Sequence, residues 1–227
     1  MLADYDRYEF HLAVQKLVSF CSDDLGAFYL DILKDRLYTS GENSAARRAA
    51  QSALHHITHA FMRLIAPILS FTADEIWQVL ALGETTVFEE LWYNIPAHAL
   101  QANRIAAWQA VISARAEAAK QIEVLRSAGE VGSSLQAEIT FHATGEQFEA
   151  LQSLVDDLRF VTITSSAAVV KVATELEQKI LVTPSKYKKC DRCWHYRADV
   201  GATAEHPTIC GRCVSNLFGA GEARKYA

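Results

Sequence analysis

The stretch "KYKKCDRCWHYRADVGATAEHPTICGRCVSN" at residues 186–216 holds four of the five cysteines of a 227-residue chain. They form two Cys-x-x-Cys pairs, Cys190/Cys193 and Cys210/Cys213, with sixteen residues between the pairs. Each such turn can direct two sulfur atoms at one centre, and two turns supply the four soft ligands that tetrahedral zinc prefers. The spacing therefore predicts one structural Zn²⁺ ion, whose filled ligand shell leaves no position for a reacting water molecule.

Four thiols can also form a redox pair, two disulfides or an iron–sulfur cluster. A thioredoxin-like redox pair needs a βαβ context, which the sequence around both pairs lacks. Disulfides are rare in a reducing cytosol, and ferredoxin-type spacings differ from the spacing here. Few large apolar side chains surround the cysteines, so we expect metal binding, worth about 10–16 kcal/mol in small zinc folds, to fold this tail.

Composition and charge narrow the class of protein. Half of the residues are hydrophobic, which suits one large domain with small appendages. The first twenty residues carry five charged side chains, and no uncharged apolar run approaches the about 18 residues of a membrane span. We therefore expect a cytoplasmic protein with no membrane partner. The net charge is −5, yet residues 185–227 hold eight Lys and Arg against four Asp and Glu, which indicates a polyanionic partner for the tail.

The first part of the chain has the pattern of a helical bundle. Apolar residues recur at steps of three and four over residues 10–21, 53–65 and 105–125. Pro67 is expected to end the second of these helices, because proline removes a backbone donor and clashes with the preceding turn.

Two helix starts are predicted from capping residues. Ser22 is a candidate N-cap that would begin a separate helix after residue 21. Thr72 and Glu75, three residues apart, predict a capping box, and Phe71 and Ile76 are placed for a hydrophobic staple around it.

The pattern changes after the loop at residues 129–134. Apolar residues alternate over 135–141 as in a half-buried strand, residues 146–158 have a helical pattern, and "FVTIT" (160–164) and "AVVKV" (168–172) predict further short strands. The predicted fold is mainly α, with a helical bundle (1–133), a small α+β junction domain with a linker (134–184) and a four-cysteine zinc finger (185–227).

Other candidate chemistry is sparse. His55 and His59 lie one helical turn apart, as in the H-E-x-x-H zinc proteases, but His56 takes the place of the catalytic glutamate. These histidines are explained more simply as side chains on the helix surface, and Cys21 as a core thiol. The sequence has no G-x-S-x-G, P-loop or G-x-G-x-x-G motif, so we expect no catalytic residue in this chain.

Several segments resemble the class I aminoacyl-tRNA synthetases. "YLDILKDRLY" (29–38) and "LIAPILSFTADEIW" (64–77) are similar to the anticodon-binding domain of the enzymes for isoleucine, valine, leucine and methionine. "VGSSLQAEITF" (131–141) is similar to the junction after that domain. The cysteine tail resembles the C-terminal zinc finger of the bacterial isoleucyl enzymes, whereas the valyl enzymes end in a coiled coil. The motifs follow the family's order along nearly the whole chain.

The resemblance implies the C-terminal part of an isoleucine--tRNA ligase, a monomeric enzyme that attaches isoleucine to tRNA(Ile) with ATP. The His-x-Gly-His and Lys-Met-Ser-Lys-Ser motifs of its catalytic domain are absent from this sequence, and so is its editing domain. We therefore expect this chain to bind tRNA without charging it, and the catalytic domains of the same polypeptide to be its partners.

An anticodon loop offers unstacked bases to aromatic and Arg planes, and phosphates to Lys and Arg. Trp194 can serve as a stacking platform, or it can pack against the zinc knuckle. His195 and Tyr196 are further stacking candidates, and Arg36 can instead form an ion pair with its neighbour Asp35. The candidate tRNA contacts are Lys186, Lys188, Lys189, Arg192, Trp194, Arg197 and Arg212 in the tail, and Arg36, Arg47 and Arg48 in the bundle.

Two other functions share some of these features. A free-standing zinc-finger module that binds RNA, or an adaptor, would carry the same motifs. DNA-repair glycosylases have a similar finger, but their catalytic N-terminal proline is replaced here by Met1–Leu2 and their β-rich start by helix. We therefore expect no DNA partner.

Overall fold

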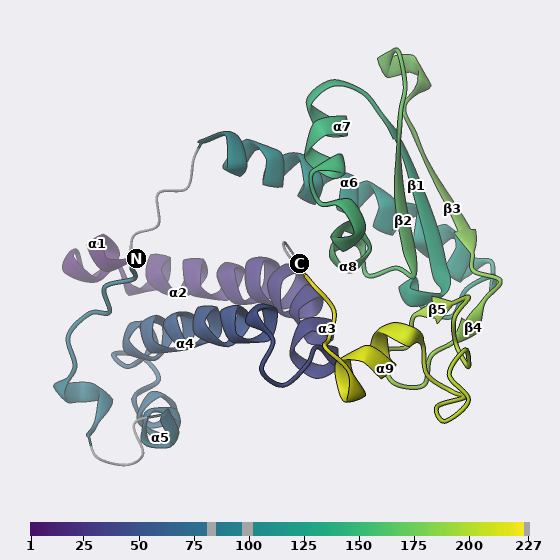
Figure 1. The fold of residues 1–227 in the computed structure, drawn as a ribbon. Helices are drawn as coiled ribbons and strands as arrows, with labels where there is room; N and C mark the ends of the chain where they lie inside the picture. Colours follow the sequence, from purple (N-terminus) through teal and green to yellow (C-terminus); the bar gives the residue numbers. More distant parts are fainter. Residues whose placement is uncertain (81–84, 97–101, 225–227) are drawn as a thin grey trace.

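The computed structural model describes residues 1–80, 85–96 and 102–224, which form two apolar cores and a cysteine-rich finger (Figure 1). Helices dominate, with a small mixed sheet and a cysteine cluster near the C-terminal end, so the predicted fold class is confirmed. Residues 225–227, at the end of the expected finger domain, lie outside the described residues. In the part of the chain that is described, no helix has the length and apolarity needed to cross a bilayer.

The first core lies between the helices of the bundle. Leu17, Met62 and Trp77, each at most 6% exposed, come together from three different helices. In Figure 1 the rod that contains α2 and α3 runs alongside α4, with α5 below. The bundle elements are α1 (Leu2–Asp6), α2 (Phe10–Ser19), the π-helix η1 (Phe20–Leu30), α3 (Asp31–Thr39), α4 (Ala45–Ile65), α5 (Ser70–Leu80) and the 3-10 turn η2 (Val87–Glu89).

The two predicted helix starts are wrong. The backbone stays helical from α2 through η1 into α3, because the apolar spacing continues past Ser22, whose hydroxyl donates to the Ser19 carbonyl within the helix. Pro67 does end α4 at Ile65, but α5 begins at Ser70, so Thr72 lies inside α5. Phe71 is 94% exposed, and the predicted staple does not form.

The inner face of α2 is also more open than the periodicity predicts. Leu17 is buried, whereas Val14 and Val18 are 37% and 61% exposed. Cys21, expected as a core thiol, is half-buried beside Phe61 in an apolar groove of about 540 Å³.

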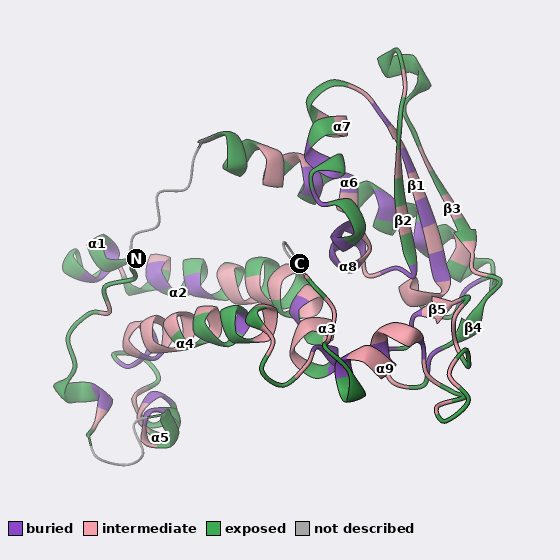
Figure 2. Cartoon of the chain, in the orientation of Figure 1, coloured by how far each residue is buried: buried purple, intermediate pink, exposed green. Residues whose placement is uncertain are grey.

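The second core lies between a three-stranded sheet and the helices that cover one of its faces. The strand order is β2-β1-β3, with β1 parallel to β2 and antiparallel to β3, so that Ile139 lies opposite Ala167 and Val182. The central strand alternates between buried and half-buried positions (Figure 2). The elements are α6 (Ala102–Ser127), η3 (Ser134–Gln136), β1 (Ala137–Ala143), α7 (Gly145–Gln152), η4 (Val155–Asp157), α8 (Leu158–Thr162), β2 (Ser166–Lys171), η5 (Glu175–Glu177) and β3 (Lys179–Pro184).

Three details of this unit differ from the predictions. "FVTIT" is not a strand, because residues up to Thr162 belong to α8 and Ile163 has a left-handed φ of 55°. A short buried helix and a buried strand present the same continuous apolar run. Strand β3 was not predicted. Helix α6, assigned to the bundle, packs Val111, Ala118 and Ile122 into the core of the sheet, and the boundary at residue 133 stays a prediction.

Phe141 on β1 tests the second core. It is 2% exposed, and Phe141→Ala should lower the free energy of unfolding by about 3–5 kcal/mol through lost burial and a residual cavity. Leu176→Ala is the control, because Leu176 is 98% exposed and its truncation should change stability by less than about 0.5 kcal/mol. Urea unfolding followed by circular dichroism measures both, and equal effects would contradict this core.

Candidate metal centre and nucleic-acid interface

The four cysteine sulfur atoms form a cluster that fits a tetrahedral metal. All four side chains are buried, and their Sγ atoms lie within 4.8 Å of one another. The Cys190–Cys213 and Cys193–Cys210 Sγ separations are both 3.8 Å. A regular tetrahedron with Zn–S bonds of about 2.3 Å has edges of about 3.8 Å. The donor set and its spacing therefore suit zinc, and not a pair of disulfides.

The cluster needs a cation to hold four negative charges. Hydrogen bonding with Cys193 lowers the pKa of Cys210 to about 3, whereas the same neighbour raises the pKa of Cys213 above its ordinary range. One thiol thus keeps its proton so that another can lose it. A bound dication stabilises all four as thiolates. Cys210 is also the N-cap of α9 (Gly211–Phe218), where the helix dipole favours negative charge.

Short-range backbone contacts hold the two knuckles. Strand β4 (Lys188–Lys189) pairs with β5 (Tyr196–Arg197), and the Trp194 amide donates to the Cys190 carbonyl at 2.9 Å across the first turn. In the second knuckle the Gly211 amide donates to Asp199 Oδ2 at 3.1 Å. A Cβ atom at Gly211 would lie 2.9 Å from that oxygen, so a larger residue here would displace the Asp199 side chain from this hydrogen bond.

Comparisons with known protein families match both the helical part of the chain and the cysteine segment. A family model described as the anticodon-binding domain of tRNA ligase matches residues 1–141. The chain belongs to this family. A second model, described as a zinc finger found in FPG and IleRS, matches residues 188–216 of the anticodon-binding chain, the segment with all four clustered cysteines.

The similar proteins are isoleucine--tRNA ligases of bacteria. The isoleucine--tRNA ligases of Burkholderia cenocepacia (strain J2315) and Paraburkholderia xenovorans are each 55% identical to this anticodon-binding chain over all 227 residues. The isoleucine--tRNA ligase of a Janthinobacterium species is 55% identical over 231 aligned positions. The chain spans about a quarter (24%) of the length of each of these relatives.

The three lysines that precede the first cysteine of the finger are exposed to solvent. We call residues 186–197 the basic hairpin; Lys186, Lys188 and Lys189 on it are all exposed. Trp194 is 58% exposed with a left-handed φ of 64°, and the Lys189 ammonium lies 5.3 Å from the centre of its ring. The indole is therefore not packed away against the metal knuckle and can accept a stacking partner.

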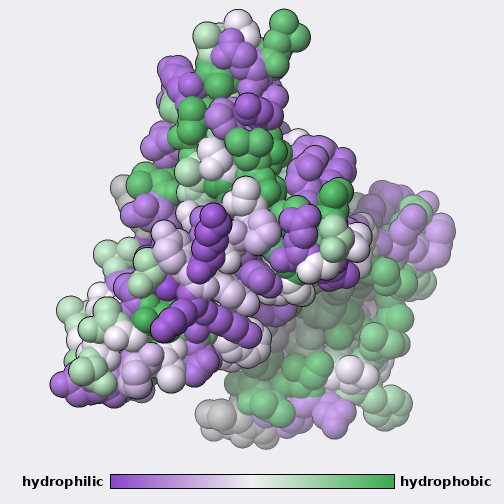
Figure 3. All heavy atoms as spheres, turned by 90° about the vertical axis from the view of Figure 1, so that its right-hand side faces the viewer, coloured by the Kyte–Doolittle hydropathy of each residue, from purple (hydrophilic) through white to green (hydrophobic). Residues whose placement is uncertain are grey.

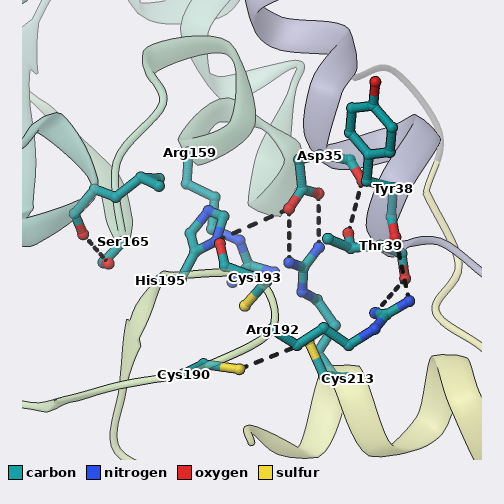
Figure 4. A network of polar contacts seen from close by, with 12 residues as sticks. Asp35, Tyr38, Thr39, Arg159, Ser165, Cys190, Arg192, Cys193, His195 and Cys213 are labelled. Atoms are coloured by element: carbon teal, nitrogen blue, oxygen red, sulfur yellow. Dashed lines mark hydrogen bonds and ion pairs between the residues drawn. The ribbon is translucent and has the colours of Figure 1, made fainter.

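The arginines of the finger contact the protein instead (Figure 4). Arg192 Nη1 donates to the Thr39 carbonyl at 2.7 Å, at the C-terminal end of α3. Arg212 pairs with Asp35 at 2.8 Å, and Arg197 approaches Asp199 at 3.7 Å. His195, a stacking candidate in the sequence, is only 3% exposed.

Asp35 is central to the contact between the bundle and the finger, although the sequence marks it only as a neighbour of Arg36. Burial alone would raise the pKa of Asp35, but the hydrogen bonds and charge of Arg212 lower it well below its ordinary value. Asp35 is therefore ionised at neutral pH. Its partner lies 177 residues away in the sequence, so no local motif could identify the pair.

The candidate contacts in the bundle differ in their exposure to solvent. Arg36 and Arg47 are half-buried, and Arg48 is exposed, where it donates to Gln51 and Asn43. Between Arg36 and Arg47, the backbone at Gly41 lies close enough to α9 that a Cβ there would be 3.7 Å from the Asn216 carbonyl oxygen. The roles of these arginines stay predictions.

A cleft of about 760 Å³ separates the bundle from the finger. Its lining includes Lys189 and Trp194 of the basic hairpin and Lys34 and Tyr38 of α3. Ser134 of η3 also lines it. Aromatic and cationic side chains thus face one space from two parts of the chain.

The histidines of α4 do not form a comparable centre. The rings of His55 and His59 lie with their centres 4.2 Å apart and their planes tilted by 49°, and His56 Nδ1 lies 2.6 Å from the Tyr93 hydroxyl. Among the described residues, the four cysteines are the only group of three or more His, Cys, Asp or Glu with ligand spacing. The expectation of surface histidines holds for His55, which is exposed, and the other two are half-buried.

Removal of one ligand tests the metal centre. Cys213→Ser should abolish zinc retention and hydrogen-exchange protection in residues 188–216, because this segment has little apolar core of its own. Strand β1 should stay protected. Cys21→Ser, which leaves the cluster intact, is the matched control. Elemental analysis and hydrogen-exchange mass spectrometry measure both, and full zinc occupancy in Cys213→Ser would contradict the assignment.

Proposed function

We propose that this chain binds the anticodon arm of tRNA(Ile) as part of an isoleucine--tRNA ligase, with one structural zinc ion in its finger. The observation that carries the proposal is the basic hairpin, which has three exposed lysines and an open indole. Lys189 and Trp194 of this hairpin line a cleft between the finger and the bundle. Family membership and the names of the relatives support the same function.

The hairpin has an electrostatic reason to bind a polyanion. Lys188 lies directly opposite Arg197 in the β4–β5 pairing, and like charges in that arrangement destabilise a strand pair. Asp199, whose Oδ1 lies 3.7 Å from Arg197 Nε, offsets part of this repulsion, and a phosphate at Lys188 would offset more of it through a charge-assisted hydrogen bond. Lys186 and Lys189 extend the same positive surface, and hydrophilic side chains cover much of this side of the molecule (Figure 3).

The cleft supplies a second mode of contact. Its volume of about 760 Å³ falls in the range of small-ligand sites and can accept a base splayed out of a loop. The backbone of Trp194 is in the left-handed region, which bulky residues rarely adopt. The fold therefore tolerates local backbone strain where the indole lies at the rim of the cleft. Tyr38, which also lines the cleft and is 75% exposed, offers a second ring.

The activity of the whole ligase is a further part of the proposal. Since the relatives are isoleucine--tRNA ligases about four times longer than this chain, we infer that catalytic domains of the same polypeptide attach isoleucine with ATP in the cytoplasm. The complete enzyme acts as a monomer in this proposal. The chain by itself binds tRNA and does not charge it.

Binding to RNA is the direct test. Gel-shift titrations should show tighter binding of tRNA(Ile) than of the same tRNA with a swapped anticodon, and chelation of zinc should weaken both complexes. Raising the salt concentration should reduce affinity, since each neutralised phosphate of a single strand contributes about 0.7 to the slope of log K against log salt. Equal affinity for both tRNAs would contradict anticodon recognition.

The two modes of contact can be separated by substitution. Lys188→Ala should reduce the slope of log K against log salt by the contribution of about one phosphate contact. The preference for the anticodon should change little. Trp194→Ala should cost about 1–3 kcal/mol of binding with the salt slope unchanged, because a stacking contact carries no charge. Lys120→Ala on α6 is the control, since Lys120 is exposed, pairs with Glu117 of the same helix and is not part of the hairpin.

In the complete ligase, deletion of the finger should impair transfer to tRNA more than formation of the aminoacyl adenylate, because only transfer requires bound RNA. Pyrophosphate exchange and aminoacylation assays separate the two steps. Equal loss of both would mean that the finger acts on the catalytic domain.

A further inference from the structure

A buried charge cluster joins the finger to the bundle. Asp35 on α3 accepts two parallel hydrogen bonds from Arg212 Nη1 and Nη2, each 2.8 Å long. Arg224 Nη1 donates to Asp35 Oδ1 at 2.6 Å, and Glu222 lies 3.2 Å from Arg212. The side chains of Arg212 and Arg224 are only 9% and 1% exposed. We call Asp35, Arg212, Glu222, Arg224 and Phe160 the Asp35 cluster.

All three parts of the chain meet at this point. Phe160 of α8 brings in the second core, because the guanidinium carbons of Arg212 and Arg224 lie 5.0 Å and 3.6 Å from its ring centre. Arg212 belongs to the second metal knuckle, between Cys210 and Cys213. Asp35 therefore links the bundle to the metal loop through one bidentate contact.

The two knuckles repeat the same arrangement. Each Cys-x-x-Cys turn has arginine just before its second cysteine, Arg192 in one and Arg212 in the other. Both side chains reach α3, Arg192 at the carbonyl groups of Tyr38 and Thr39 and Arg212 at Asp35. A folded metal cluster thus aims two guanidinium groups at one short helix.

We propose that Asp35 is a positioning residue that fixes the orientation of the finger on α3. It thereby keeps the basic hairpin and the cleft in the relative position that RNA binding requires. Asp35 does not contact the RNA, because its carboxylate oxygens face Arg212 and Arg224. Its effect on RNA rests on the proposed function, whereas its effect on the orientation of the finger does not.

Asp35→Asn tests the proposal. The amide is isosteric but offers one acceptor oxygen and no charge, so the parallel pair with Arg212 is lost. Asp24→Asn is the matched control, because Asp24 is an exposed aspartate on the same helical rod. Spin labels on non-natural amino acids at Gln51 of α4 and Ala204 of the finger, both exposed, report the distance between the two parts.

The expected result has three components. The wild type and Asp24→Asn should give one narrow distance distribution, and Asp35→Asn a broad one with zinc content unchanged. If the competent orientation is then populated about a tenth of the time, the apparent affinity for tRNA falls about tenfold. A narrow distribution in Asp35→Asn would overturn the proposal, and so would loss of zinc, which would mean that Asp35 serves folding of the finger.

Arg212→Lys keeps the test decisive if Asp35→Asn does not fold. Lysine retains the charge that a phosphate contact needs but cannot form the parallel pair with Asp35. A broadened distance distribution supports positioning, and an unchanged one contradicts it. If wild-type chain fails to bind tRNA while the distributions behave as expected, the proposed function fails and the positioning role of Asp35 stands.

Discussion

Four sulfur atoms within 4.8 Å of one another cannot all carry negative charge unless a cation lies among them. The finger depends on this constraint because Val200 and Ile209 are the only hydrophobic side chains that pack on the cluster among the described residues. Its strands are two residues long, too short to be stable alone. The metal therefore takes the place of a hydrophobic core, and the positions of the lysines and Trp194 follow from metal coordination.

The cations of the finger divide by residue type. Arg192, Arg212 and Arg224 turn inward, where a planar guanidinium can pair with a carboxylate or with carbonyl groups at the end of a helix. The lysines of the basic hairpin turn outward. A compact ammonium holds its hydration strongly and suits solvent-exposed contacts with phosphates. The cations of the tail thus fall into two sets. The inward arginines hold the finger in place, and the exposed lysines are available to a polyanion.

Local patterns in the sequence predicted what local physics determines. The cysteine spacing predicted the metal cluster, and three- and four-residue periodicity predicted the long helices α4 and α6. Capping residues misplaced the start of α5, because helical hydrogen bonds resume right after the turn at Pro67: the Ala73 amide already donates to the Leu69 carbonyl. Asp35 could not be assigned its partner, since its pairing with Arg212 depends on tertiary structure. The division of the tail cations into inward arginines and outward lysines was hidden for the same reason.

The small α+β unit has a role that follows from its contacts with the finger. The Tyr196 amide of the basic hairpin donates to Ser165 Oγ at 2.6 Å, and Ser165 in turn donates to the Leu135 carbonyl in η3, just before β1. Phe160 lies beneath the guanidinium groups of the Asp35 cluster. The edge of the sheet therefore supports one side of the finger while α3 holds the other. Helices α8 and α3 each bury an apolar side chain, Phe160 in one and Leu33 in the other, so both supports are anchored in the protein. Together they hold the finger against the sheet and the bundle.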